Sequence, residues 1–292
     1  MFKRIFLSIW MLLIGFAASY GQTTIIGPTT NNGSFEDATN TAWQIVNGTQ
    51  TNKWVIGTGA NAGFSGTKAA YISNSTSAPF THTYTNNSIS SVYLYQDVTF
   101  PAAQPVVNLS FKYIGQGEAG SWDKLAVYIS NGSTPTTLTA GTPSGGTSAN
   151  LVLTDYTQIG GPYWLNSSWT NISIPITQAQ AGNATASSTR RIVFLWSNDG
   201  SGGIDPPAGV DDVLLTAACS GPIGLNASAI TTNSATLNWT ALTGATGYNV
   251  RYKKVSDPVT VATWATPTAV AAGTTSLAIT GLQHLVPSMS FR

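Results

Sequence analysis

The sequence predicts an all-β protein, a jelly-roll β-sandwich followed by an incomplete immunoglobulin-like β-sandwich. Short segments in which apolar and polar residues alternate recur along the chain, a pattern typical of strands with one buried face. Runs rich in Gly, Pro and Asn separate these segments and have the composition of tight turns. Residues 178–186 form one weak helical candidate. Many short strands joined by such turns favour a sandwich.

The N-terminus has the three parts of a secretory signal peptide. Lys3 and Arg4 form a short basic stretch, residues 5–18 are almost wholly apolar, and Ser19 and Gly21 place small residues near the expected cleavage point. The apolar run is shorter than the roughly 20 residues that a membrane-spanning helix needs. We therefore predict that residues 1–21 are removed on export. The mature chain would have no membrane span and would be secreted or displayed at the cell surface.

The expected strands of the first sandwich show a period of two. Residues 192–196 are instead apolar at every position, as expected for a central strand with both faces covered. The alternating apolar positions are Val92, Leu94 and Val98, then Val107, Leu109, Phe111 and Tyr113, and then Leu125, Val127 and Ile129.

A domain boundary is predicted at the stretch Cys-Ser-Gly-Pro that begins at Cys219, because Pro and Gly suit a short linker and a new rhythm of strands follows. The predicted organisation is a signal peptide over residues 1–21, a jelly-roll domain over 22–217, a linker over 218–221 and a truncated second domain over 222–292.

Composition narrows the classes of partner and the sources of stability. Charged residues make up 8% of the chain and the formal net charge is +1. A near-neutral chain has no electrostatic footprint for nucleic acid or an anionic membrane. The expected partner is an extracellular glycan or a surface protein. Cys219 is the only cysteine, so no internal disulfide staples the exported chain, and its stability must come from burial or a bound ion.

Acidic residues mark both ends of the first domain. Glu36 and Asp37 follow an Asn-Gly-Ser-Phe stretch near its start, and Asp211 and Asp212 lie in its last expected strand. The first and last strands of a jelly roll commonly lie side by side, which would bring these acids together. Convergent carboxylates repel unless a cation lies between them, and calcium takes several oxygen ligands. The alternative is that all four acids lie on solvated turns.

The period of the last strand distinguishes its two acids. Asp211, Val213 and Leu215 share one face, so Asp211 is expected to point toward the core with them. A carboxylate facing inward needs a partner. Asp211 is therefore a better ligand candidate than Asp212.

The Asn-Gly-Ser-Phe-Glu opening and the Val-Asp-Asp-Val close together resemble a known group. They look like the MAM-like and choice-of-anchor J, or cleaved-adhesin-type, jelly rolls of Bacteroidetes surface proteins, and their relatives among calcium-binding carbohydrate-binding modules. Residues 122–127 look like the central strand of that family, and residues 169–174 are similar to the strand that follows. The resemblance covers residues 30–216. It implies a structural calcium ion near the domain termini, with Glu36 and Asp211 as side-chain ligands and Asp37 and Asp212 as secondary candidates.

The second domain resembles a fibronectin type III domain. Residues 234–239 look like its second strand with an inward Trp239, residues 247–253 like its third, and residues 275–282 like the strand before the tyrosine corner. The last two strands of that family have no counterpart before residue 292. The resemblance implies a truncated spacer or adhesive module.

Aromatic residues beside turns are the candidates for glycan binding. Aromatic faces stack on sugar rings, and the Tyr163–Trp164 pair follows a Gly-Gly-Pro turn. Trp122 and Trp54 also lie next to turn-like segments. The competing interpretation is that these rings are core residues, because aromatic side chains dominate sandwich cores.

No catalytic constellation is found in the sequence. The only histidines are His82 and His284, and no Gly-x-Ser-x-Gly motif or phosphate-binding loop occurs. Glu118 and Asp123 flank one turn and have the residue types of a glycosidase pair, although a solvated loop explains them more simply. The predicted function is therefore a secreted or cell-surface, non-catalytic binding or adhesion protein. The alternative is the ancillary N-terminal portion of a larger secreted hydrolase, a peptidase or glycoside hydrolase whose catalytic domain is outside this chain. A structural spacer is a third possibility.

Overall fold

The computed structural model describes residues 22–59, 63–102, 104, 106–120, 122–141, 154–218, 224–231, 233–241, 247–252, 268–271 and 273–282. The predicted signal peptide (1–21), Cys219 with most of the predicted linker, and residues 283–292 with His284 lie outside these residues. No helix in the described part of the chain is long and apolar enough to cross a membrane. The described residues fall into two compact units that divide after residue 219.

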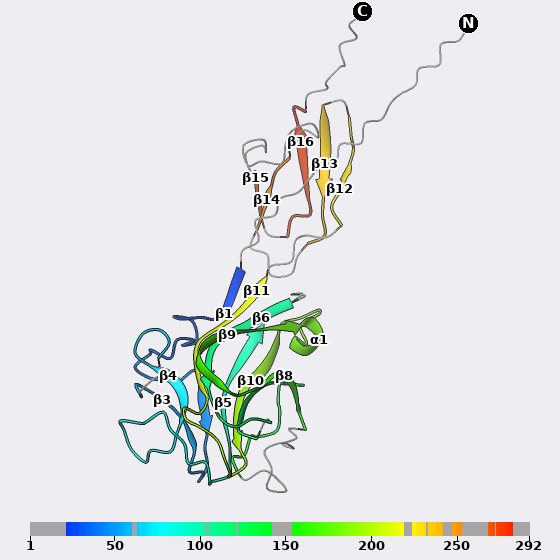
Figure 1. The fold of residues 1–292 in the computed structure, drawn as a ribbon. Helices are drawn as coiled ribbons and strands as arrows, with labels where there is room; N and C mark the ends of the chain where they lie inside the picture. Colours follow the sequence, from blue (N-terminus) through cyan, green and yellow to red (C-terminus); the bar gives the residue numbers. More distant parts are fainter. Residues whose placement is uncertain are drawn as a thin grey trace, which may run out of the picture. The chain divides into compact units, whose positions relative to one another are not determined.

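The first unit is a jelly-roll sandwich of two antiparallel sheets, as predicted (Figure 1). The chain passes back and forth between the sheets, so strands distant in sequence become neighbours. The first sheet has the order β3 (Lys53–Gly57), β4 (Ala69–Ser73), β11 (Gly209–Ala218), β6 (Val106–Gly115) and β9 (Asn166–Thr177), with β1 (Gln22–Ile26) paired to β11. The second has the order β2 (Gln44–Val46), β5 (Ser90–Phe100), β10 (Ser188–Asn198), β7 (Lys124–Ser130) and β8 (Tyr156–Tyr163).

The first and last strands of this unit pair, as the sequence predicts. β1 runs antiparallel to β11, with Thr23 opposite Ala217 and Ile26 opposite Leu215. The weak helical candidate is a single short helix, α1 (Gln178–Ala181). Thr177 caps it in a capping box, and Gly182 ends it in a left-handed conformation.

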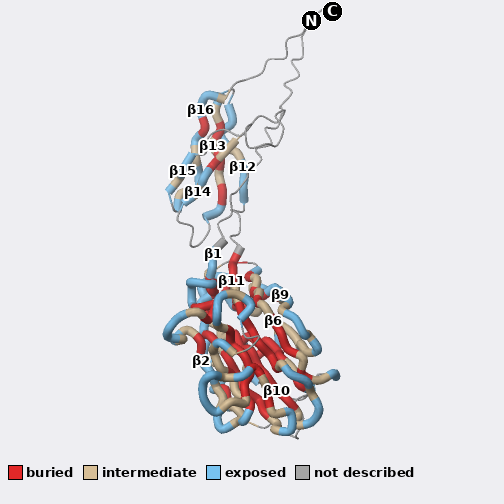
Figure 2. Tube along the Cα trace, turned by 60° about the vertical axis from the view of Figure 1, so that its left-hand side comes forward, coloured by how far each residue is buried: buried red, intermediate tan, exposed pale blue. Residues whose placement is uncertain are grey.

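The core lies between the two sheets, where Figure 2 shows the buried stretches of the strands. The alternating positions predicted for β5, β6 and β7 are buried there. β10 is covered on both faces: Ile192, Phe194 and Trp196 face the core, while Val193 and Leu195 lie in a second apolar cluster on the outer face of the sheet.

A bulge in β11 corrects the orientation predicted for Asp211. The register against β6 shifts between Asp211 and Leu214, and Asp212 adopts a φ of 47°. Val213 faces the core, but Asp211 lies opposite Lys112 of β6, on the outer face of the sheet. Period two predicts the wrong side because a bulge inserts one residue into the alternation.

The second unit has a three-stranded and a two-stranded sheet. Trp239 is 5% exposed and lies in its small core, as expected for an inward tryptophan. The strands are β12 (Asn226–Ser228), β13 (Ser234–Asn238) and β16 (Ser276–Thr280) in one sheet, and β14 (Gly247–Val250) and β15 (Thr268–Ala271) in the other.

Candidate functional site

Acids from both ends of the first sandwich contact the loop that joins β3 to β4. Asp211 accepts two amides at Oδ2, from Phe64 at 2.8 Å and Ser65 at 3.1 Å. Its Oδ1 accepts the amide of Asp212 at 2.7 Å, and Oδ1 of Asp212 accepts the Ser65 hydroxyl at 2.6 Å. Asp211 is fully buried, and burial raises its pKa to about 6 although these three amides act to lower it.

Glu36 holds the other half of this loop. Its Oε1 accepts the amides of Thr67 at 2.8 Å and Lys68 at 2.6 Å, and its Oε2 accepts the Thr67 hydroxyl at 2.9 Å. The Lys68 ammonium donates to the main-chain carbonyls of Glu36 at 3.2 Å and Asp37 at 3.0 Å. Burial acts to raise the pKa of Glu36, but the Lys68 and Thr67 donors outweigh it and the pKa lies below its usual value.

The donors around these acids do not fit the calcium site implied by the resemblance. A carboxylate oxygen has about two lone-pair positions, and Oδ2 of Asp211 and Oε1 of Glu36 each already accept two N–H groups. The carbonyls of Glu36 and Asp37, which a calcium ion would use, accept an ammonium instead. The pairing of β1 with β11 thus brings Glu36 and Asp211 to the same loop, residues 64–68. We call Glu36, Asp211 and residues 64–68 the corner. N–H groups rather than a cation bind the carboxylate oxygens there.

The aromatic candidates differ in exposure. Trp54 is 1% exposed, and its indole N–H donates to the Val92 carbonyl at 3.2 Å, so it is a core residue and not a ligand platform. Tyr163 packs its ring against the core, with its centroid 5.6 Å from that of Tyr113. Trp164 is half-buried, and Trp122 is 37% exposed.

A second group of acids assembles at the end of the sandwich where β7 begins and β10 ends. Asp123 directly precedes β7 and Asp199 directly follows β10, and these two strands pair antiparallel. Glu118 comes from the loop between β6 and β7, where its amide donates to the Asp123 carbonyl. Carboxylate oxygens of the three residues lie within 4.8 Å of one another. We call Glu118, Asp123 and Asp199 the acidic cluster.

The acidic cluster concentrates negative charge in a partly buried place. Asp123 is fully buried, and its oxygens accept the Tyr84 hydroxyl and the Asp199 amide. Burial raises the pKa of Asp123 to about 6, and the charges of Asp199 and Glu118 contribute to this rise. The two donors act in the opposite direction. Oε2 of Glu118 is buried without a hydrogen-bond partner, and within the described residues no ion pair joins the cluster to a basic side chain.

Three carboxylates in one small volume, one with an unpartnered buried oxygen, are a donor set that could bind a metal ion. A hard cation such as Ca²⁺ prefers oxygen ligands and would remove the mutual repulsion of the three charges. In the sequence, Glu118 and Asp123 flank one turn and suggest only a glycosidase pair. Their contact with Asp199 depends on how two distant loops converge, which a local pattern does not show.

Exposed apolar side chains surround the loops that carry the acidic cluster. A β-bridge joins Gly117 to Ile204, and the Leu165 amide donates to the Gln116 carbonyl at 2.6 Å. Trp122, next to Asp123 in the chain, is 37% exposed, Leu165 51% and Ile204 60%. We call the loops at this end of the sandwich, residues 116–120, 122–123, 164–165 and 199–206, the loop end.

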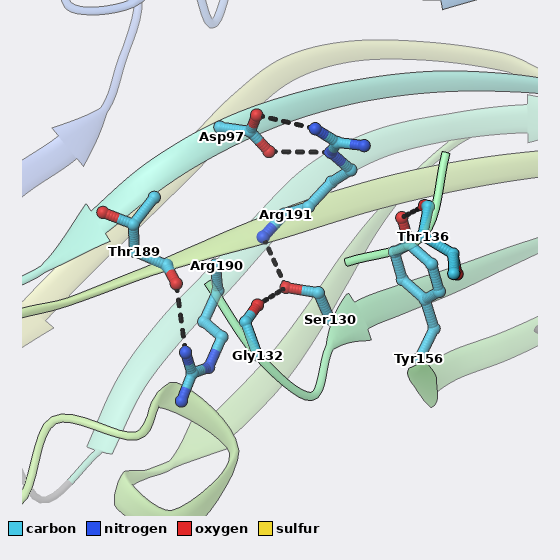
Figure 3. A network of polar contacts seen from close by, with 8 residues as sticks. All are labelled: Asp97, Ser130, Gly132, Thr136, Tyr156, Thr189, Arg190 and Arg191. Atoms are coloured by element: carbon cyan, nitrogen blue, oxygen red, sulfur yellow. Dashed lines mark hydrogen bonds and ion pairs between the residues drawn. The ribbon is translucent and has the colours of Figure 1, made fainter. Parts of the chain in front are cut away.

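The outer face of the second sheet carries a further set of aromatic side chains. Tyr93, Tyr128 and Tyr156 lie there with Leu138, which comes from the loop after β7. Figure 3 shows the polar contacts at one end of this face. The Arg191 guanidinium donates two hydrogen bonds to Asp97 at 2.8 and 2.9 Å, and its carbon lies 4.0 Å from the centroid of the Tyr95 ring. The Tyr156 hydroxyl donates to the Thr136 carbonyl at 3.0 Å and ties the loop to the sheet.

The sequence carried a signal for this outer face. Tyr93 and Tyr95 alternate with Val92 and Leu94, so β5 is apolar on both faces in its first half. A strand of that kind needs cover on both sides. Tyr93 and Tyr95 therefore indicate an apolar layer on the outer face of β5.

Among the residues that the structure describes, His82 and the acids at the loop end do not form a hydrolytic site. His82 is 4% exposed, its Nε2 lies 2.9 Å from the Pro207 carbonyl, and its ring packs on Tyr71. Asp123 has no surface with which to reach a substrate. A glycosidase needs two carboxyl groups that flank the bond to be cleaved. Glu118 and Asp123 do not meet that requirement.

Comparisons with known proteins give distant matches. No protein-family model and no curated protein matches this chain. Among solved structures, the xylan-binding domain CBM22-1 of Xyn10C from Paenibacillus barcinonensis is 14% identical over 70% of this chain and 100% of that one, with a TM-score of 0.37. The K3 cleaved adhesin domain of Lys-gingipain from Porphyromonas gingivalis is 12% identical over 67% and 100%, with a TM-score of 0.34. A cyclase from Fischerella sp. TAU is 14% identical over 68% and 98%, with a TM-score of 0.38.

Proposed function

We propose that this chain is an exported, non-catalytic binding or adhesion protein that binds an extracellular glycan, or a surface protein, at the loop end. The observation that carries the proposal is the exposed indole of Trp122 directly beside the acidic cluster. An aromatic face supplies stacking area for a sugar ring, and the half-buried Asp199 offers carboxylate oxygens to its hydroxyl groups. The half-buried Trp164 and the neighbouring Tyr163 extend this region as supporting residues.

We also propose that the structural calcium ion expected for this domain binds the acidic cluster rather than Glu36 and Asp211. The support is the unpartnered Oε2 of Glu118 and the raised pKa of Asp123, both of which a cation would relieve. An ion that binds only the folded state stabilises it by mass action, by about 2.7 kcal/mol when free calcium is about 100 times its Kd.

The test of ligand binding is a glycan array with the exported chain, measured in calcium and in chelator. Trp122→Ala should reduce binding by roughly 5- to 160-fold, since stacking on an aromatic side chain is worth about 1–3 kcal/mol in comparable contacts. The matched control is Phe64→Ala, because Phe64 is 46% exposed but lies in the β3–β4 loop. Equal binding by wild type and Trp122→Ala would contradict the proposed site.

The test of the metal site is thermal unfolding with calcium and with chelator. The melting temperature of the wild type should be several degrees higher in calcium, and Asp199→Asn should remove that difference. A calcium effect that survives Asp199→Asn would place the ion elsewhere.

The proposed organisation follows the sequence resemblances. Residues 22–217 are a jelly-roll domain of the MAM-like or cleaved-adhesin type, and residues 222–292 belong to a fibronectin type III domain. The second unit serves as a spacer or adhesive module, and the signal peptide directs the chain to the cell exterior.

A further inference from the structure

At the corner, the hydrogen-bond donors to Glu36 and Asp211 all belong to the chain itself. Five donors of the segment Phe64–Lys68, four amides and the Thr67 hydroxyl, point at the two carboxylates. Hydrogen bonds to a carboxylate are about twice as strong as those between neutral groups. The two acids therefore fasten this loop over the outer face of the first sheet.

Lys68 completes the corner. Its ammonium, a compact charge with three donors, contacts the carbonyls of Glu36 and Asp37, so its positive charge lies beside the main chain that carries the Glu36 carboxylate. A second lysine, Lys112, lies opposite Asp211 across the β6–β11 pair, and its Nζ is 4.4 Å from the centroid of the Phe64 ring. Two lysines thus lie next to the segments that carry these acids.

The loop conformation depends on a glycine at its centre. Gly66 has a φ of 64°, and a Cβ added there would lie 2.5 Å from Oε1 of Glu36. No side chain fits between the loop and the carboxylate, so the amides on either side of Gly66 can approach Glu36 and Asp211 directly.

We propose that this corner is fastened without a metal, and that the Lys68 ammonium, rather than calcium, binds the main-chain carbonyls beside the two acids. Calcium would have to displace the ammonium and several amide donors, because these already meet the oxygens it needs. The stability of the corner then depends on Lys68 and is independent of calcium.

The experiment measures thermal unfolding of the full exported chain in calcium and in chelator, in an Asp199→Asn background that disables the acidic cluster. We expect equal melting temperatures in the two buffers. Adding Lys68→Met should lower the melting temperature by roughly 3 to 12 °C in both, since the charge-assisted hydrogen bonds to the two carbonyls are lost. Lys68→Arg should restore most of the loss, because a guanidinium also donates to carbonyls.

Two results would overturn the proposal. One is a calcium-dependent rise in melting temperature in the Asp199→Asn background that disappears on adding Glu36→Gln, which would place a metal at this corner. The other is a Lys68→Met variant as stable as its parent. Far-ultraviolet circular dichroism checks that each variant is folded. The result does not depend on whether the loop end binds a glycan.

Discussion

At the scale of single residues, the environment of a carboxylate decides its chemistry. Asp211 and Asp123 are both fully buried with a pKa of about 6, but Asp211 accepts three amides whereas Asp123 shares its surroundings with two other acids. The first arrangement suits a structural anchor and the second a cation site. The residue type alone distinguishes neither, because the difference lies in which donors the fold supplies.

The pKa of Asp211 leads to a pH prediction for stability, measured in chelator. Its pKa is about 6 in the folded chain and about 3.9 unfolded, so the folded state binds more protons between these values. The free energy of unfolding should therefore rise as the pH falls from 7 to 5, by about 1 kcal/mol for this group. Asp212 and the facing Lys112 share this environment. Glu36, whose pKa is lowered, loses its contribution only below this window.

Urea unfolding at pH 7, 6 and 5 checks this prediction. The rise in unfolding free energy between pH 7 and pH 5 should be about 1 kcal/mol smaller in Asp211→Asn than in the wild type. An unchanged pH profile in the variant would show that Asp211 does not titrate in this range.

At the scale of elements, the bulge in β11 sets the position of the acids. It turns Asp211 toward the β3–β4 loop and keeps Val213 in the core. The main chain at Gly33 packs against the bulge, where the Val213 amide donates to the Gly33 carbonyl at 2.8 Å. A Cβ added to Gly33 would lie 2.1 Å from the Val213 carbonyl oxygen. Close approach of two main chains leaves room for glycine alone.

Gly33→Ala should therefore destabilise the first sandwich by about 1–3 kcal/mol, because the added methyl group must displace the main chain of β11. Chemical denaturation gives the change in unfolding free energy. Gly132→Ala is the matched control, since no heavy atom lies within 4 Å of a Cβ added there. Equal stability of the two variants would contradict the close packing described for Gly33.

At the scale of the whole molecule, each unit has its own core. The main cluster of the first unit contains only residues between Ile25 and Ala217, and the cluster of the second contains Leu237, Trp239, Val250 and Ile279 with their partly buried neighbours. A unit that buries its apolar surface internally can fold by itself.

A fragment of residues 22–218 should then unfold cooperatively. Its melting temperature should lie within a few degrees of the transition in which the first unit of the mature chain unfolds. Differential scanning calorimetry of both proteins makes the comparison. A fragment that binds hydrophobic dye and melts without a sharp transition would show that the first unit needs the second.

The sequence by itself determined the all-β class and the alternating core positions of β5, β6 and β7, because period-two alternation is a local property of the chain. The pairing of the first and last strands was expected from the jelly-roll fold class and is present in the structure. The tertiary structure alone decided that Asp211 faces outward, that Trp54 is buried, and that amides and Lys68 meet the acids. It also assembled Glu118, Asp123 and Asp199. These features depend on one inserted residue or on the convergence of distant loops, and a local pattern contains neither.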